Sequence, residues 1–123
     1  MAAVNLTAEA FEKTITENSI VIIDFWASWC GPCKAFAPTF EEVSEEHADV
    51  VFAKVNTEEQ RELAGHFGIR SIPTLAIFRD QILLYKEAGA LPKPALQEIL
   101  EKVKALDMDD VRRQIAEQEA PTT

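Results

Sequence analysis

One segment, residues 20–26, restricts the fold of this chain more than any other. Its sequence, IVIIDFW, is rich in β-branched and aromatic side chains and is apolar at every position except Asp24. Successive side chains of a strand point to opposite faces, so both faces of this strand need to be covered, as in the centre of a sheet packed between helices. The segment therefore predicts a buried central strand.

The rest of the chain alternates between helical and extended patterns. Helices are predicted over four ranges: 7–19, 30–47, 58–67 and from about 92 onward. Thr7 is a suitable cap for the first helix, Pro38 lies inside the second, and Gly68 closes the third. Further strands are predicted over 50–56, 74–78 and 82–86, and the last two are close enough for an antiparallel hairpin. This order predicts an α/β fold with helices covering both faces of a mixed sheet.

The length of 123 residues fits a single domain with a short addition. We expect the domain to occupy residues 1–106 and an acidic helical extension to occupy residues 107–123. In the extension, Met108, Val111 and Ile115 lie at spacings of three and four, as on one face of a helix. Five acidic residues and two arginines give the extension −3 of the net charge of −9.

The acidic balance excludes several classes of partner. With 12 basic and 21 acidic residues, the chain is a poor match for a nucleic-acid backbone or an anionic membrane. No apolar run approaches the roughly 20 residues needed to cross a bilayer, and the first residues lack the basic start and apolar core of a signal peptide. We therefore expect a protein of the reducing cytoplasm, and we expect it to be a monomer.

The two cysteines, Cys30 and Cys33, lie where the central strand turns into the next helix. They are too close in sequence to join distant parts of a fold, which excludes the disulfide-rich secreted class. Residues three apart on a helix are roughly 5–6 Å apart, close enough to form a disulfide. At the helix start, unpaired backbone N–H groups and the helix dipole favour a negative charge, so Cys30 is the candidate thiolate. Cys33, one turn further in, is expected to be more buried.

Several motifs resemble the bacterial-type thioredoxins in order and spacing over about residues 4–106. They are DFWASWCGPC from Asp24, Ala37-Pro38, AKVN from Ala53, GIRSIPT from Gly68 and Ala88-Gly89-Ala90. The resemblance implies a thioredoxin fold, with a central mixed five-stranded sheet flanked by helices on both faces. It also implies a protein-disulfide reductase and electron carrier that needs no cofactor or metal of its own, and that maintains cell redox homeostasis.

The same resemblance assigns the chemistry to individual residues. Cys30 is the nucleophile that forms a mixed disulfide with a client protein, and Cys33 resolves it. An NADPH-dependent flavoprotein, thioredoxin reductase, then reduces the dithiol again. Asp24 is the proton acceptor for Cys33, and Lys54 modulates Asp24. Independently, burying a charged carboxylate in an apolar strand is costly, which predicts a raised pKa for Asp24.

The resemblance also implies a client-binding surface around the cysteines. Pro73 is expected in the cis form, facing the cysteines, with the adjoining backbone pairing with an extended client segment. The apolar surface around Cys30 is expected to contain Trp29, Gly31, Pro32, Ile72 and Gly89.

Three other interpretations compete with this one. A zinc site would need further ligands, and His47 lies fourteen residues beyond Cys33 along the same predicted helix, about 21 Å away. A thioredoxin-fold chaperone or assembly subunit would not require the dithiol. An oxidase or isomerase would differ in redox potential, and the Gly-Pro dipeptide between the cysteines disfavours it.

The acidic run over residues 41–49 is either a solvated face or a feature that discriminates among clients.

Overall fold

The computed structural model describes residues 2–119 of the chain. The elements are β1 Val4–Asn5, α1 Ala8–Glu17, β2 Ile20–Trp26, α2 Gly31–Glu46, β3 Val51–Asn56, α3 Arg61–His66, β4 Thr74–Arg79, β5 Ile82–Ala88, α4 Lys93–Ala105 and α5 Met108–Glu119. None of the helices in this part of the chain is long and apolar enough to span a membrane.

The five strands form one mixed sheet in the order β1-β3-β2-β4-β5. The central strand, β2, pairs in parallel with β3 and antiparallel with β4, while β1 is parallel to β3 and β5 is antiparallel to β4. This confirms the predicted mixed sheet and the central position of residues 20–26. The two-residue strand β1 was not predicted from its own residues, because it is too short for a periodic pattern; the five-stranded count came from the resemblance.

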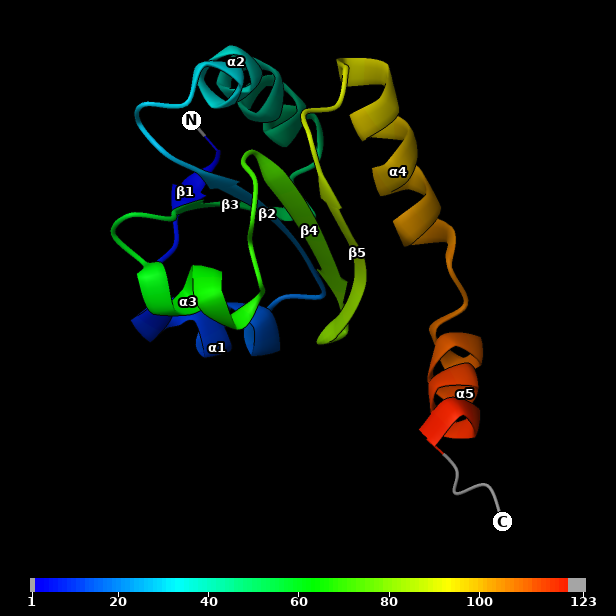
Figure 1. Cartoon of the computed structure of the whole chain (residues 1–123). Coiled ribbons are helices and arrows are strands. Elements are labelled where there is room, and N and C mark those ends of the chain that lie inside the picture. The colour runs from blue at the N-terminus through cyan, green and yellow to red at the C-terminus, as the bar shows by residue number, and fades with distance from the viewer. Residues whose placement is uncertain (1, 120–123) are drawn as a thin grey trace.

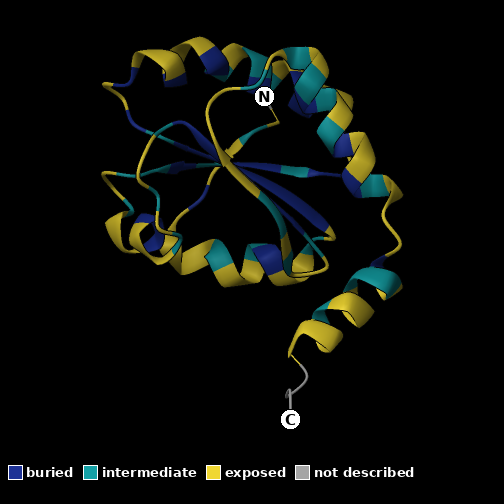
Figure 2. Ribbon diagram, turned by 45° about the vertical axis from the view of Figure 1, so that its right-hand side comes forward, coloured by how far each residue is buried: buried dark blue, intermediate teal, exposed yellow. Residues whose placement is uncertain are grey.

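Two helical layers cover the sheet. Figures 1 and 2 show α2 and α4 on one face and α1 and α3 on the other, with the sheet between them. Alternate residues of β2 fill the two cores: Ile22 packs with Phe40 of α2 and Leu100 of α4, whereas Ile23 packs with Ile15 of α1 and Leu63 of α3. The alternation explains why this strand has almost no polar positions.

The helix predicted over residues 58–67 begins later, at Arg61. The side-chain oxygen of Asn56 accepts hydrogen bonds from the N–H groups of Glu58 and Glu59, at 2.9 and 3.2 Å, and this turn occupies the start of the predicted helix. The predicted role of Gly68 at the other end is confirmed, because its φ of 63° is the left-handed conformation that favours glycine.

The hairpin between β4 and β5 is confirmed, and its strands are longer than predicted. The connection contains only Asp80 and Gln81, both with positive φ, at 51° and 70°. A two-residue hairpin loop requires this left-handed geometry, which aspartate tolerates better than most residues other than glycine. The pairing register also shifts between Ile77 and Phe78.

The acidic run over residues 41–49 is largely exposed to solvent, and three of its carboxylates also form ion pairs with lysines of α4. Lys93 of α4 lies 2.6 Å from Glu42 and 3.0 Å from Glu46, and Lys104 lies 3.0 Å from Asp49. His47, at the C-terminal end of α2, is buried, and its Nδ1 lies 2.7 Å from Lys104 Nζ. The position of His47 at the end of α2 agrees with the predicted helix over residues 30–47. Its burial results from the packing of α4 against α2.

The predicted C-terminal helix is present as α5 and extends away from the body (Figure 1). Its first residue, Met108, is buried, and Val111 and Ile115 are half-buried, so the predicted apolar face is only partly covered. Arg112 forms an ion pair with Asp80 of the hairpin loop at 3.4 Å. Residues 120–123, the end of the predicted extension, lie outside the described residues.

Arg79, at the end of β4, connects the sheet to the C-terminal end of α4. Its Nη1 donates hydrogen bonds to the carbonyl oxygens of Val103, Lys104 and Leu106 at 2.8, 3.1 and 2.9 Å. The last carbonyls of a helix lack the regular intrahelical donors, and of these three that of Val103 also accepts a backbone N–H, from Leu106 at 3.4 Å. A cation at this end therefore compensates both the end carbonyls and the helix dipole.

We predict that Arg79→Met lowers the free energy of unfolding by about 1–3 kcal/mol, because three charge-assisted hydrogen bonds are lost. Urea unfolding measures the change, and Lys13→Met on the exposed side of α1 is the control, with an expected change within about 0.5 kcal/mol. Equal stability of the Arg79 variant and the control would contradict the assigned role.

Candidate active site

Cys30 and Cys33 lie at the junction between β2 and α2 and are joined as a disulfide. Cys30 is the N-cap of α2, and the Cα atoms of the two cysteines are 5.2 Å apart. Pro32 occupies the first helical turn, where its missing N–H would have had no partner within the helix. The pair can therefore open and close with little movement of the backbone.

The sulfur of Cys30 lies at the positive end of the helix. Cys30 Sγ accepts a hydrogen bond from the backbone N–H of Cys33 at 3.2 Å. A backbone donor and the helix dipole both stabilise negative charge on this sulfur, which is the electrostatic setting of a reactive thiolate. The expected difference in burial is small, since Cys30 is 4% and Cys33 2% exposed.

Asp24 is fully buried in the middle of β2. Within the described part of the chain, neither of its carboxylate oxygens has a hydrogen-bond partner. Burial raises the pKa of Asp24 to about 7, in the predicted direction, and the charge of Lys54 partly offsets this effect. Lys54 is the register partner of Asp24 on β3, so the two side chains project from the same face of the sheet.

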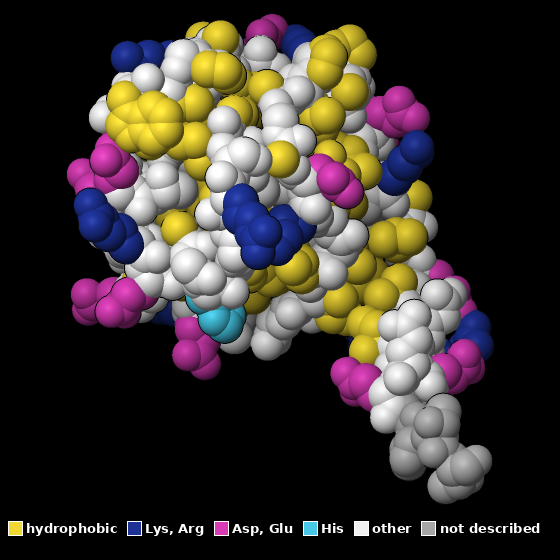
Figure 3. Space-filling model, viewed as in Figure 1, with side chains coloured by type: hydrophobic (Ala, Val, Ile, Leu, Met, Phe, Trp, Pro, Cys, Tyr) yellow, Lys and Arg dark blue, Asp and Glu magenta, His cyan; other side chains and the backbone are white. Residues whose placement is uncertain are grey.

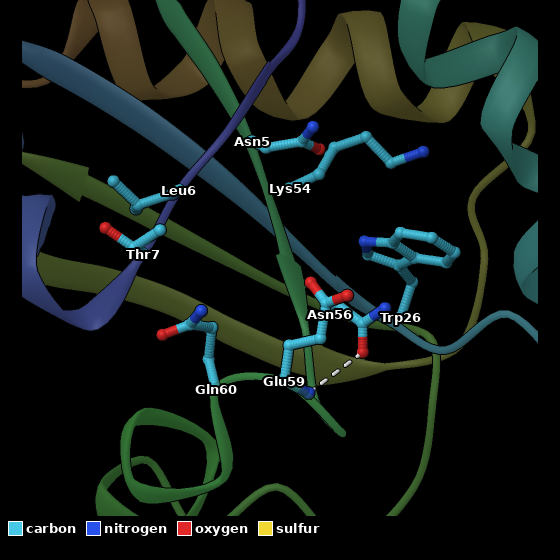
Figure 4. A pocket seen from close by; sticks show the side chains of 8 residues that line it. All are labelled: Asn5, Leu6, Thr7, Trp26, Lys54, Asn56, Glu59 and Gln60. Carbon is cyan, nitrogen blue, oxygen red and sulfur yellow. Dashed lines mark hydrogen bonds between the residues drawn. The ribbon is translucent and has the colours of Figure 1, made fainter.

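Lys54 also lines a pocket of about 290 Å³ together with Trp26 of β2 (Figure 4). Lys54 Nζ lies 4.8 Å from the centroid of the Trp26 ring, within cation–π distance. The pocket also contains Asn5, Asn56 and Gln60, which add polar groups to its wall. Lys54 therefore extends from beside a buried carboxylate to a hollow of the surface.

The loop before β4 meets the start of α2. The Ile72–Pro73 peptide bond is cis, as the resemblance implies. The carbonyl oxygen of Ile72 lies 3.7 Å from Cys30 Sγ, and the carbonyl oxygen of Pro73 accepts a hydrogen bond from the N–H of Gly89 at 2.8 Å. Gly89 has a φ of 105°, a conformation that disfavours other residues. The loop at residues 72–73 thus lies beside Cys30 and is hydrogen-bonded in turn to Gly89, so three segments far apart in the sequence are connected here.

Trp29 is 67% exposed, and Gly31 and Pro32 are also exposed. Trp29 and Ile72 line a shallow pocket of about 170 Å³ beside the dithiol. Sequence reasoning missed three polar residues on the wall of this pocket, Thr57, Arg70 and Ser71. Arg70 and Ser71 belong to the GIRSIPT motif, which could have drawn attention to them. Their position beside the dithiol becomes visible only in the folded loop.

Within residues 2–119, no three histidine, cysteine, aspartate or glutamate side chains are grouped as metal ligands. The site brings together the two sulfurs and, on the preceding strand, the buried carboxylate of Asp24 with Lys54 beside it.

Comparisons with known proteins agree with this geometry. The family model described as thioredoxin matches residues 2–102. Putative thioredoxin 2 of Streptomyces coelicolor is 52% identical over 119 residues, covering 97% of this chain and 89% of the relative. Thioredoxin of Bacillus subtilis is 42% identical over 103 residues, covering 83% and 98%. The structure of a mutant thioredoxin from Halobacterium salinarum superposes with a TM-score of 0.78 at 29% identity, covering 85% of this chain and 93% of that one.

The raised pKa of Asp24 predicts that ionising this carboxyl lowers the free energy of unfolding, by an amount that depends on pH. The folded protein favours the protonated acid up to about pH 7, whereas the unfolded chain ionises from about 3.8, so stability is lost as the pH rises through this window. We predict that Asp24→Asn raises the free energy of unfolding relative to the original chain, by roughly 3–4 kcal/mol more at pH 8 than at pH 4.

Denaturant unfolding of the disulfide form at both pH values measures this difference. Glu101→Gln, at an exposed position of α4, is the control and is expected to show no such pH-dependent gain. A gain for Asp24→Asn that is the same at both pH values would show that the carboxylate does not titrate near neutrality.

Proposed function

Because the chain belongs to the thioredoxin family, we propose that Cys30 and Cys33 perform its chemistry as attacking and resolving cysteines. The chain is a thiol–disulfide oxidoreductase with thioredoxin function. The observation that carries the assignment of roles is the position of Cys30 at the N-cap of α2, where its sulfur accepts the N–H of Cys33. Of the two sulfurs, this one is better placed to hold a negative charge.

The proposed reaction transfers two electrons from the dithiol to a client disulfide. The Cys30 thiolate attacks one client sulfur, a mixed disulfide forms, and the other client sulfur leaves as a thiolate. The Cys33 thiolate then attacks the sulfur of Cys30, which forms the Cys30–Cys33 disulfide and releases the second client thiolate. The protons of the two thiols end on the two client sulfurs, directly or through solvent.

We propose Asp24 as the acceptor of the Cys33 proton. A pKa of about 7 suits this role, because a base is most effective when its pKa is close to the working pH. Lys54 modulates Asp24, since its positive charge on the neighbouring strand favours the carboxylate form. The unpaired oxygens of Asp24 leave it free to accept a proton within the described part of the chain.

The proposed client surface surrounds Cys30. It consists of Trp29, Gly31, Pro32, Ile72, Pro73 and Gly89. The exposure of Trp29 and the proximity of the Ile72 carbonyl to Cys30 support this assignment. An extended client segment would pair with the backbone beside Pro73 as an added strand while its disulfide meets the Cys30 sulfur.

Family membership supports proteins with disulfides as clients and a reductase as electron donor. We propose that an NADPH-dependent flavoprotein of the thioredoxin reductase class reduces the dithiol, and that the protein works as a monomer in the cytoplasm without nucleic acid or membrane as partner. A chaperone or assembly role that does not use the dithiol is not favoured, since the chain is 42–52% identical to thioredoxins over most of its length and holds a disulfide-capable cysteine pair.

Single cysteine variants separate the two proposed roles. We predict that Cys33→Ser forms a stable mixed disulfide with insulin, because nothing resolves it, whereas Cys30→Ser forms none. Non-reducing electrophoresis detects the adduct. Both variants are expected to lose catalysed insulin reduction, and an adduct formed by Cys30→Ser instead would reverse the assignment.

Removing α5 tests whether the extension takes part in this chemistry. We predict that truncation after Leu106 keeps insulin reduction within about twofold and lowers the free energy of unfolding by about 1–3 kcal/mol, the order expected for losing one buried methionine. The rate of insulin reduction by the truncated chain and its urea unfolding are measured in parallel. A large loss of turnover in a truncated protein that remains folded would contradict the proposal that residues 107–123 are separate from the catalytic domain.

A further inference from the structure

We infer that this dithiol favours clients with acidic side chains next to their disulfide, and that Arg70 and Lys86 recognise those side chains. The inference rests on the proposed function and adds a class of client to it. The chain as a whole has a net charge of −9, yet the side chains beside the site include basic ones.

Many cations of the described chain are engaged in ion pairs on α4 and α5. They are Lys93, Lys102, Lys104, Arg112 and Arg113. Arg79 is bound to the carbonyl end of α4. Arg70 and Lys86 are exposed and form no ion pair with any residue in the range 2–119. Their positive charge is therefore available to an incoming molecule.

Arg70 lies on the wall between two hollows of the surface. One hollow, of about 170 Å³, contains Trp29 and Ile72 beside the dithiol. The other, of about 150 Å³, contains Lys86 and Thr74. Residues 69–71 line both hollows, so Arg70 is shared between them. Figure 3 shows basic side chains near the middle of one face of the molecule, surrounded mainly by white and yellow atoms with an acidic side chain nearby.

The second hollow is adjacent to the proposed client backbone. Thr74 follows Pro73 directly, and its register partner on β5 is Ala88, two residues from Lys86. A client segment that pairs with the backbone beside Pro73 also runs past Thr74, which lines this hollow. Lys86 and Arg70 are therefore placed to meet residues that flank the client disulfide.

The chemistry of the two cations suits carboxylates. Arg70 offers a planar guanidinium that matches a carboxylate with two parallel hydrogen bonds. Lys86 Nζ donates to the carbonyl oxygen of Phe67 at 2.7 Å, which holds it in place and leaves its other N–H groups free. Glu87 lines neither hollow, because alternation along β5 directs it to the other face of the sheet.

The test compares peptides that each contain one intramolecular disulfide and differ only in the residues beside the cysteines: glutamate, glutamine or lysine. The rate constant for reduction by the reduced full-length chain is measured by acid quenching and chromatography, at low and at high salt. We expect the glutamate peptide to react about two- to tenfold faster than the glutamine peptide, the range for one or two exposed ion pairs. The difference is expected to shrink at high salt.

The variant Arg70→Gln/Lys86→Gln is expected to remove the preference, so that it reduces the glutamate and glutamine peptides at equal rates. Lys13→Gln/Lys102→Gln changes the net charge equally at positions outside both hollows, and it is expected to keep the preference. Equal rates for the three peptides, faster reduction of the lysine peptide, or loss of preference in both double variants would overturn the inference. If no peptide is reduced, the proposed function itself fails, so the two failures are distinguishable.

Discussion

The burial of β2 between two apolar layers is the constraint on which the rest of this structure depends. Its side chains alternate between the core under α2 and α4 and the core under α1 and α3. Because the strand is held from both faces, its end is a fixed point from which the chain turns into α2. The cysteine pair is located at that turn, so the packed core holds the dithiol in a fixed position.

The same burial creates two opposite electrostatic environments close together in sequence. Asp24 lies in the dry core, where desolvation raises its pKa to about 7. Six residues later, Cys30 lies at a helix N-terminus, where the backbone donor of Cys33 favours a negative charge on sulfur. One environment favours the protonated form of a carboxylate, and the other favours negative charge on a sulfur.

Much of the fold was predictable because its signals are local. The helix caps at Thr7 and Gly68 and the apolar face of α4 each depend on neighbours within a few residues. The misplaced start of α3 has a similarly local cause, the turn made by the side chain of Asn56, which competes with the helix for the same N–H groups. The burial of His47 was not predictable, because α4, far away in sequence, covers it.

By itself, the sequence determined the buried central strand, the pair of cysteines at the start of the following helix, and the carboxylate in the strand. These features follow from period and spacing, which are properties of adjacent residues. Only the tertiary structure decided that the Ile72 carbonyl lies beside Cys30, that Gly89 is hydrogen-bonded to Pro73, that Arg70 lies between two hollows, and that α5 stands away from the body. Contacts between distant segments depend on how the sheet and its helices close around one another, and no local pattern specifies that closure.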